Sequence, residues 1–383
     1  MSLLLTMQLA QPARRLWHPS AKAVRVCGLP AYNLALQAYS SPATNGQFQS
    51  TGPSPEVIHV TDPGDPRLVL YRQKRRRGKH DEAEHDAQVR ILTLRASAAS
   101  AEHLQDAEAA SRSWPGETSA LPTSRSSKGK TESESECVVG LHYSWDCLRR
   151  LGEARAAGRS VLVDSLLAPS TGPENGPSQK LLSLATGLVP VIYTVEPKVF
   201  QSEFQSKEAG QAASACSFAV AYPVSQPLLA LRPPILVLDE VESARNIGEI
   251  LRSALHLGVT SVVASRGSWN CLTGRAARTS MGWIYHIDFH LADQLPEALQ
   301  DLRASGVRIY TAESDATEAV IPHLPHGDRR WALVMGNEES GVSEQSRALS
   351  DQVVCVPQRG GASLNVANAA SICLYELGRH MLP

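Results

Sequence analysis

Three short segments in the C-terminal half combine glycines with polar side chains that could do chemistry. The segments are DEVESARNIGEILRSALHLG (239–258), VMGNEESGV (334–342) and RGGASLNVANAASICLYEL (359–377). Their candidate side chains are Asn246, Arg252, Glu338, Ser363 and Asn365. An arginine can hold a phosphate or a reacting hydroxyl, and glycines allow a ligand to approach the backbone closely. Together these residue types are suited to binding an anionic or hydroxyl-bearing substrate.

Each segment also has an ordinary structural interpretation. Asn246 could cap a helix, and Arg252 could pair with Glu249 at i, i+3 spacing. Glu338 could belong to a plain strand-to-helix loop. That segment lacks both the G-x-G-x-x-G pattern and the GK[ST] of a P-loop, so neither class of nucleotide site is supported.

The third segment predicts a helix from Leu364 that is apolar on every side and therefore largely covered by protein. Ser363 is a plausible cap for it, after the flexible pair Gly360 and Gly361. Asn365, Asn368 and Ser371 are three apart, so they form one polar stripe that begins near the N-terminus. The positive end of a helix dipole there suits an anion or an electron-rich ligand, whereas asparagines satisfied by backbone are the common alternative.

The elements around these segments alternate regularly after residue 235. Strands are expected at 235–240, 261–265, 307–313, 331–336 and 353–357, and helices at 246–257, 273–281, 294–305 and from Leu364. Alternation of strands and helices predicts an α/β fold with a parallel sheet. Ligands of such sheets bind beyond the carboxyl ends of the strands, which is where the three segments begin.

The rest of the chain predicts two further regions. Residues 57–228 are expected to form a small α/β domain, with strands at 56–60, 160–164 and 189–195 and a helix near 143–151. A polar insertion at about 80–136 contains few large apolar residues and is expected to be disordered. The run from Arg72 to Lys79 is the densest basic patch, and it suits either a phosphate backbone or a solvated loop neutralised by nearby acids.

Residues 1–56 form the third region, and its first 55 residues contain no Asp or Glu and four Lys or Arg. This composition is typical of a mitochondrial or plastid transit peptide, with a disordered tail as the alternative.

Composition excludes several classes of protein. The chain of 383 residues is 43% hydrophobic and 20% charged, with a net charge of −1, so any site for a polyanion must be a local patch. Its seven cysteines show no C-x-x-C pair, which predicts reduced thiols and no structural metal. No apolar run reaches the roughly 18 to 20 residues of a membrane helix.

Taken together and in this order, the three segments resemble the motifs of the SpoU/TrmH family of RNA ribose 2′-O-methyltransferases, in the SPOUT superfamily. The intervening TGRAARTSMGWIYHI (273–287) resembles a family segment with paired arginines, and 57–228 is more loosely similar to the family's substrate-binding region. The resemblance implies a Rossmann-like parallel-sheet domain at 229–383 with a trefoil knot. It also implies S-adenosyl-L-methionine as cofactor, RNA as substrate, a homodimer and no metal.

By motif position, the resemblance assigns main-chain contacts with the cofactor to Gly336, Val356 and Leu364. The functional polar set would be Arg252, Asn246, Glu338, Ser363 and Asn365, with Glu338 orienting Asn365 or the arginine. Asn337 stands where Ser, Thr or Ala is more usual in the family. His256 is a conventional base candidate on the same helix as Arg252, although a surface histidine is the commoner interpretation.

Three functions therefore remain open. The first is methylation of a ribose in structured RNA, with organellar ribosomal RNA favoured over transfer RNA. The second is a catalytically silent RNA-binding or ribosome-assembly factor on the same fold. The third is an unrelated α/β enzyme that cradles a phosphate with the sequence GGAS.

Overall fold

The computed structural model describes residues 52–71, 137–142, 145–159, 161–204, 216–314, 321–359 and 363–382. Gln49–Pro383 form one compact unit, and all of these residues belong to it. The leader predicted for residues 1–56 lies almost wholly outside the described residues. The predicted insertion at 80–136 and the basic run from Arg72 to Lys79 also lie outside them, so all three stay predictions.

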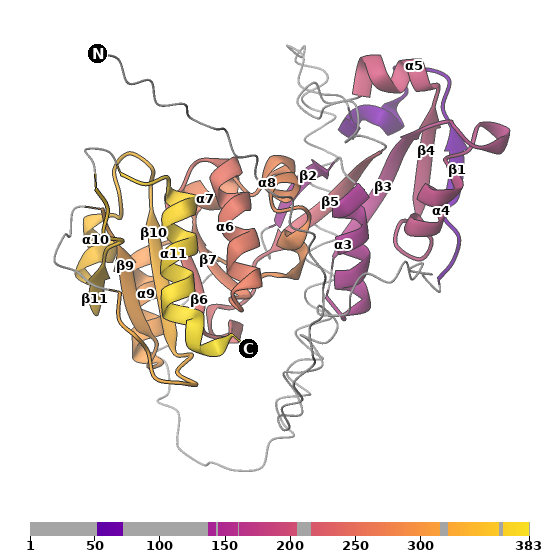
Figure 1. The fold of residues 1–383 in the computed structure, drawn as a ribbon. Coiled ribbons are helices and arrows are strands. Elements are labelled where there is room, and N and C mark those ends of the chain that lie inside the picture. Colours follow the sequence, from indigo (N-terminus) through magenta and orange to yellow (C-terminus); the bar gives the residue numbers. More distant parts are fainter. Residues whose placement is uncertain are drawn as a thin grey trace, which may run out of the picture. The chain divides into compact units, whose positions relative to one another are not determined.

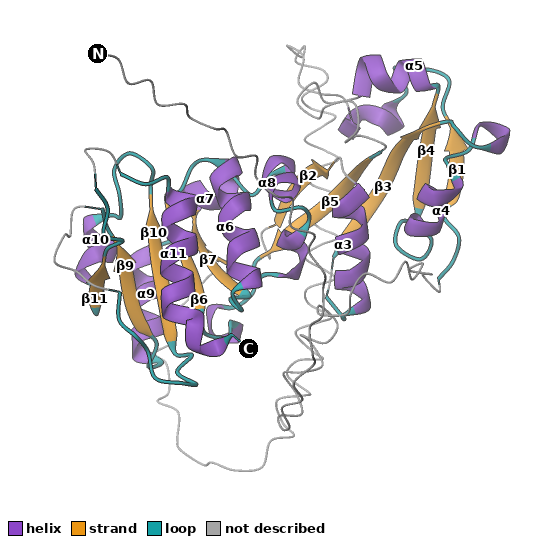
Figure 2. Cartoon of the chain, viewed as in Figure 1, coloured by secondary structure: helices purple, strands orange, loops and turns teal. Residues whose placement is uncertain are grey.

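The N-terminal part of this unit is built on a mixed five-stranded sheet (Figures 1 and 2). Its order is β1-β4-β3-β5-β2, in which β1, β4 and β3 pair in parallel and β5 pairs antiparallel with β3 and β2. The strands are β1 (Glu56–His59), β2 (Cys137–His142), β3 (Leu162–Pro169), β4 (Val191–Val195) and β5 (Ser217–Val224). The helices and helical turns are η1 (Pro66–Tyr71), α3 (Trp145–Ala156), η2 (Pro173–Asn175), α4 (Gln179–Ala185), α5 (Pro197–Val199) and η3 (Phe200–Phe204).

The C-terminal part is built on a six-stranded sheet in the order β11-β9-β10-β6-β7-β8, with every pairing parallel. The strands are β6 (Ile235–Asp239), β7 (Ser261–Ser265), β8 (Asp288–Ala292), β9 (Arg308–Ala312), β10 (Trp331–Gly336) and β11 (Gln352–Val354). The helices and helical turns are η4 (Leu228–Ala230), α6 (Ala244–His256), α7 (Arg266–Asn270), α8 (Gly274–Thr279), η5 (Trp283–His286), α9 (Leu295–Ala304), α10 (Glu344–Ala348), α11 (Val366–Gly378) and η6 (Arg379–Met381). The predicted parallel α/β fold is thus confirmed.

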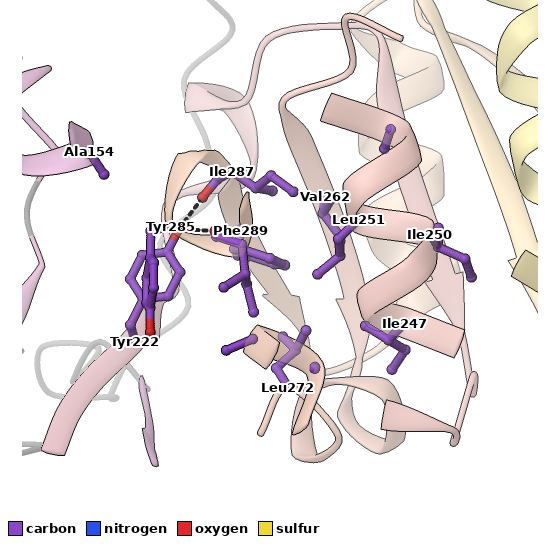
Figure 3. Close-up of a cluster of buried hydrophobic side chains, with 14 of the residues drawn as sticks. Ala154, Tyr222, Ile247, Ile250, Leu251, Val262, Leu272, Tyr285, Ile287 and Phe289 are labelled. Atoms are coloured by element: carbon purple, nitrogen blue, oxygen red, sulfur yellow. Dashed lines mark hydrogen bonds between the residues drawn. The ribbon is translucent and has the colours of Figure 1, made fainter. Parts of the chain in front are cut away.

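Helices cover both faces of the parallel sheet, as its sequence requires. Every residue of β6 and β10 is buried, which is why these strands are apolar without polar alternation. Along β6, Leu236 and Leu238 join a cluster that includes α6, α8 and α11, while Ile235 and Val237 join a second cluster with α9. In Figure 3, Leu251 of α6 lies beside Val262 of β7 in the first cluster.

One close approach within the first cluster depends on Gly248. A Cβ at this position would overlap the side chain of Thr279 and the carbonyl oxygen of Ala276 in α8. Gly248 therefore lets α6 and α8 meet at backbone distance, which brings the helix that carries Asn246 and Arg252 against the 273–281 segment.

The N-terminal and C-terminal parts of this unit contact each other around Tyr222, near the end of β5. The Tyr222 hydroxyl lies 2.7 Å from the carbonyl oxygen of Ile284. It lies 2.5 Å from the carbonyl oxygen of Ile287, which is labelled in Figure 3. An ion pair of 2.5 Å also joins Arg159 to Asp288 of β8. The division into domains at residues 228 and 229 stays a prediction, and so does the trefoil knot.

Several predicted element ends are wrong for identifiable reasons. The helix expected from Asn246 begins at Ala244, because Ser243 and not Asn246 accepts the N-terminal backbone hydrogen bond. The last helix begins at Val366, with Asn365 rather than Ser363 as its N-cap. The strand expected at 353–357 instead begins at Gln352 and ends at Val354. The strands β2, β5 and β8 and the short helices α7 and α10 were not predicted.

The last helix is also less covered than its composition predicts. Its side chains Ile372 and Tyr375 are 39% and 48% exposed, and Asn368 on the same face is exposed too. The Ser371 hydroxyl donates to the carbonyl oxygen of Ala367 at 2.8 Å, and its oxygen also lies 2.8 Å from the hydroxyl oxygen of Ser253 in α6. Of the three residues of the polar stripe, Asn365 therefore lies at the site, Asn368 faces solvent, and Ser371 contacts α6.

Two absences hold for the residues that the structure describes. No helix among them has the length and hydropathy to cross a membrane. No group of three or more His, Cys, Asp or Glu side chains in the same residues could hold a metal ion.

Stability in this part of the fold should depend on pH through His286. Its side chain is 3% exposed, and its Nε2 donates to the carbonyl oxygen of Arg150 at 3.1 Å. Burial, followed by the charge of Arg159, lowers the pKa of His286 to about 4. An unfolded histidine titrates near 6.5, so between about pH 6.5 and 4 the unfolded state binds more protons and stability falls with acidification.

We therefore expect the urea midpoint of the protein to fall between pH 6.5 and 4.5, and this fall to be smaller in His286→Gln, which keeps a side-chain N–H donor. Urea titrations of both proteins at pH 7.5, 6.5, 5.5 and 4.5 measure the difference. Parallel pH dependence in the two proteins would show that His286 is not the group responsible.

Candidate functional site

The sheet register brings the first two candidate segments together. The last residues of β6 and β10 pair, with Gly336 opposite Asp239, so the segments that follow them leave the same edge of the sheet. Asp239 is 4% exposed, and its Oδ2 accepts from the backbone N–H and the hydroxyl of Ser343 at 3.0 and 2.8 Å. This buried carboxylate fixes the end of the second segment to the start of the first.

Asn337 closes the turn in the second segment. Its backbone N–H and carbonyl exchange hydrogen bonds with Gly341, and its Oδ1 accepts from the backbone N–H groups of Glu339 and Ser340. Its Nδ2 donates to the carbonyl oxygen of Glu240 at 2.8 Å. Asn337 therefore gives the turn its shape.

Glu338 joins this turn to the start of α6. Its carboxylate accepts from Nδ2 of Asn246 at 2.7 Å and from the backbone N–H groups of Glu242 and Ser243, each at 3.2 Å. A carboxylate is favourable at a helix N-terminus because the unpaired N–H groups there carry partial positive charge. Glu338 therefore both anchors the second segment and sets the orientation of Asn246.

The third segment adds Asn365 to the same chain of hydrogen bonds. Asn246 directs its Nδ2 to the Glu338 carboxylate, so its Oδ1 is the atom that accepts from Nδ2 of Asn365 at 3.2 Å. Oδ1 of Asn365 accepts from the backbone N–H of Ala367 at 2.9 Å, which caps α11. Glu338, Asn246 and Asn365, from three separate segments, thus form one ordered chain. The expectation that Glu338 orients Asn365 holds only indirectly, through Asn246.

A cavity of about 350 Å³ opens beside this chain. It is walled by the ends of β9 and β10, the residues after β11 and the start of α11. Its apolar lining includes Met335, Val354, Val356, Leu364, Val366 and Ala369. Its polar lining includes Glu313, Asn337, Glu338, Gln358, Ser363 and Asn365. A pocket of this size with apolar walls and a few convergent polar groups is suited to a small organic ligand.

The residues predicted to contact a cofactor all line this cavity, namely Gly336, Val356 and Leu364. Ser363 lines it too and is exposed, whereas Gly360 and Gly361 lie outside the described residues. Leu364 is 38% exposed, so its apolar side chain is accessible at the wall of the cavity. These placements agree with the predicted site, and the roles of the residues stay predictions.

Arg252 is not among the residues that line the cavity. It lies on the outer face of α6 and is exposed, and the pairing with Glu249 considered from the sequence is wrong because Glu249 pairs with Arg245 at 3.0 Å. Within the described residues, the guanidinium of Arg252 has no carboxylate partner. It is thus available to an anion that approaches from outside the chain.

His256 lies one turn beyond Arg252 and is also exposed. Its Nδ1 is 2.8 Å from the carbonyl oxygen of Arg252, so Nδ1 carries the hydrogen of this bond. The ring packs edge-on against Trp283, with ring centroids 5.1 Å apart. His256 is outside the cavity, and its contacts match those of a helix-surface histidine.

Sequence reasoning missed several residues of the cavity. Glu313 and Ser314 follow β9 directly, and their position after a parallel strand was the available signal. Gln358 directly precedes the third segment, and from the sequence it is an ordinary loop residue. Cys373 lines the cavity from α11, and burial raises its thiol pKa to about 12, so it stays protonated at neutral pH.

The turn between β10 and α10 should tolerate no side chain at Gly336. A Cβ there would overlap the carbonyl carbon of Gly341 and the amide nitrogen of Val342, which are backbone atoms that cannot rotate away. We expect Gly336→Ala to lower the free energy of unfolding by about 1–3 kcal/mol. Urea denaturation measures the loss, with Ser340→Ala, an exposed position in the same turn, as the control. Equal stability of Gly336→Ala and the unmodified protein would contradict this packing.

The comparisons with known proteins agree with this geometry. Residues 233–375 match the model of the SpoU rRNA Methylase family. Over 253 residues the chain is 29% identical to the 23S rRNA (guanosine(2553)-2′-O)-methyltransferase RlmP of Bacillus subtilis, a match that spans 65% of this chain and 91% of that protein. Over 152 residues it is 34% identical to a 23S rRNA (guanosine-2′-O-)-methyltransferase RlmB of Burkholderia, covering 39% of this chain and 61% of that protein.

Solved structures show the same fold. The AdoMet-bound rRNA methyltransferase of Sinorhizobium meliloti aligns with a TM-score of 0.54 at 18% identity, over 85% of this chain and 99% of that one. The SpoU methyltransferase AviRb of Streptomyces viridochromogenes, in complex with AdoMet, aligns with a TM-score of 0.52 at 21% identity, over 63% and 89%. The family match includes the six-stranded sheet and the three converging segments. The chain therefore contains a domain of the SpoU rRNA methylase family at residues 233–375.

Proposed function

We propose that this protein transfers a methyl group from S-adenosylmethionine to a ribose 2′-hydroxyl of structured ribosomal RNA. The observation that carries the proposal is the hydrogen-bonded chain Glu338–Asn246–Asn365 beside the cavity. The reaction and the choice of ribosomal over transfer RNA are supported by the names of the relatives from Bacillus subtilis and Burkholderia.

The cavity fits S-adenosylmethionine in size and in the chemistry of its walls. Val356, Leu364 and Ala369 offer apolar surface to an adenine ring, and Gly336 also lines the cavity. Glu313, Glu338 and Glu339 supply negative charge around a cationic ligand. When bound, this cofactor supplies an electrophilic methyl group on a sulfonium.

The main task of the chain's own residues is alignment. An in-line displacement requires the attacking oxygen, the methyl carbon and the sulfur to be nearly collinear. Holding the reactants in this geometry can lower the activation barrier by several kcal/mol, and positioning effects as a whole reach ~7–11 kcal/mol. Glu338 fixes the amide orientation of Asn246, and Asn246 with the backbone N–H of Ala367 fixes that of Asn365, so neither amide needs to reorient at the moment of reaction.

Arg252 is proposed to position the 2′-hydroxyl and the adjacent phosphate. A guanidinium with a pKa above about 12 is a poor base in water, so any part in removing the hydroxyl proton depends on contact with the RNA phosphate. Arg252 is exposed, and none of the residues that the structure describes pairs a carboxylate with it, which suits that contact.

The proposed active form is a homodimer. Ile372 and Tyr375 are exposed on one face of α11, and Arg252 is exposed on α6, which packs beside α11 (Figure 1). A second copy on this face would cover the apolar side chains, and it would bring Arg252 of one subunit near the partner's cavity. Such a dimer would also explain why Arg252 does not line the cavity of its own chain.

We expect Ile372→Asp to shift the protein from dimer to monomer in sedimentation velocity at micromolar concentration, because the carboxylate cannot be buried unpaired in an interface. Val57→Asp is the matched control, since Val57 is 41% exposed on β1 of the other sheet. A monomeric unmodified protein, or a dimer that survives Ile372→Asp, would contradict this interface.

The proposed location is a mitochondrion or plastid, supported by the acid-free composition of the first 55 residues. A fluorescent protein fused behind residues 1–56 should enter one of these organelles, and a cytosolic signal for that fusion would refute the proposal.

Titration calorimetry with S-adenosylmethionine and S-adenosylhomocysteine is the test of the cofactor. Binding of both ligands by the unmodified protein is expected. Absence of binding would overturn the methyltransferase proposal, whereas binding without methyl transfer to any RNA would support a silent RNA-binding factor.

A further inference from the structure

The side chain of Gln358 makes an unusual hydrogen bond to a backbone group near the start of the third segment. Its Oε1 accepts a hydrogen bond from the backbone N–H of Leu364, six residues later, at 3.0 Å. Both residues line the cavity. Because a backbone N–H can only donate, this bond identifies the atom facing Leu364 as the amide oxygen of Gln358, not its nitrogen.

This bond acts at the residue that precedes the N-cap of α11. The first N–H groups of a helix have no partners within it, and Asn365 satisfies one of them by accepting from Ala367. Gln358 satisfies the N–H of Leu364, just outside the helix. The backbone from Leu364 to Ala367 is therefore held at two successive points by two different side chains.

The held stretch supplies two parts of the site. Leu364 presents an exposed apolar side chain to the cavity, and Asn365 donates to Asn246. A shift of the Leu364 backbone would move both at once. No other side-chain hydrogen bond to the backbone of Leu364 is found in the described part of the chain.

We propose that Gln358 is a positioning residue for the cofactor, which latches Leu364 in place through its amide oxygen. The inference rests on the proposed function, since the ligand it concerns is S-adenosylmethionine. Gln358 acts on the methyl-transfer reaction only through Leu364 and Asn365.

Two variants separate the latch from other effects of substitution. Gln358→Met keeps the length of the side chain but has no oxygen to accept from Leu364. Gln358→Glu keeps an acceptor oxygen at the same place and loses the amide N–H donors. Gln345→Met, at an exposed position of α10, is the control for the same chemical change away from the cavity.

We expect Gln358→Met to weaken binding of S-adenosylmethionine and S-adenosylhomocysteine about fivefold to tenfold, the value of one lost hydrogen bond. The KM for the cofactor should rise by more than kcat falls, and affinity for RNA should not change. The cofactor affinity of Gln358→Glu should stay within about threefold of that of the unmodified protein. The cofactor affinity of Gln345→Met should equal that of the unmodified protein.

Amide hydrogen exchange gives a readout besides activity. Exchange at Leu364 should be faster in Gln358→Met than in the unmodified protein and should stay slow in Gln358→Glu at pH 7. Unchanged cofactor affinity in Gln358→Met, or equal losses in the Met and Glu variants, would overturn the latch. Failure of the unmodified protein to bind cofactor would instead overturn the proposed function itself.

Discussion

Arg252→Ala should lower the rate of single-turnover methylation by about 10²–10³-fold, the loss typical of one preorganised donor. The guanidinium is exposed on α6 and, within the described residues, has no carboxylate partner. Its removal should therefore leave folding and cofactor affinity unchanged. Arg252→Lys should recover only part of the rate, because an ammonium cannot hold a hydroxyl and a phosphate in the fixed geometry of a guanidinium.

Arg245→Ala is the matched control for this experiment. Arg245 is exposed on the same face of α6, but its guanidinium pairs with Glu249 at 3.0 Å. Exposed pairs of this kind contribute at most about 1 kcal/mol, so little change in rate is expected. Full single-turnover methylation by Arg252→Ala, with RNA affinity intact, would remove Arg252 from the proposed site.

Asn365→Ala should lower methylation about 10²-fold and the free energy of unfolding by about 1 kcal/mol, because this side chain both caps α11 and donates to Asn246. The two roles use different atoms. Oδ1 accepts from the backbone N–H of Ala367, and Nδ2 donates to Asn246.

Asn365→Asp separates these roles. An aspartate is as good an N-cap as asparagine, so stability in urea should be retained. It has no N–H to donate to Oδ1 of Asn246, so methylation should fall nearly as far as in Asn365→Ala. Asn368→Ala, at an exposed position of the same helix, should change neither quantity. Normal methylation by a folded Asn365→Ala protein would refute this placement of the asparagine.

The sequence predicted the parallel sheet well because its strands are marked by local chemistry. β6, β7 and β10 are continuous apolar runs bounded by polar or turn residues, and burial on both faces requires that pattern. β5 was missed although it is equally buried, because Ala219, Ala221 and Pro223 give it a weak strand signal. β8 was missed because Asp288 and His290 interrupt its apolar pattern.

The site was predictable in its members and not in its connections. Glu338, Asn246 and Asn365 came from motif position, whereas the order of their hydrogen bonds depends on the pairing of β6 with β10 and on the close packing of α6 with α11. Which polar side chain caps the N-terminus of a helix depends on competition between neighbouring residues. Ser243 displaced Asn246 from that role, and this left the Asn246 amide for Glu338.

Gln358 shows the limit of reasoning from residue types. A glutamine in a loop has many possible partners, and only the three-dimensional path of the third segment places its oxygen at the N–H of Leu364. The same holds for Arg252, whose apparent partner Glu249 is taken by Arg245 at i, i+4, one turn earlier.

The most direct test of the central claim is mass-spectrometric mapping of ribose-methylated nucleotides in organellar ribosomal and transfer RNA, with and without this protein. We predict that one 2′-O-methyl mark in ribosomal RNA disappears without the protein, and that the unmodified protein restores it whereas Arg252→Ala does not. Loss of a mark in transfer RNA instead would support the methyltransferase activity but show that the substrate is transfer RNA. An unchanged map, in cells where the protein is shown to reach the organelle, would contradict the claim that it is a ribose methyltransferase.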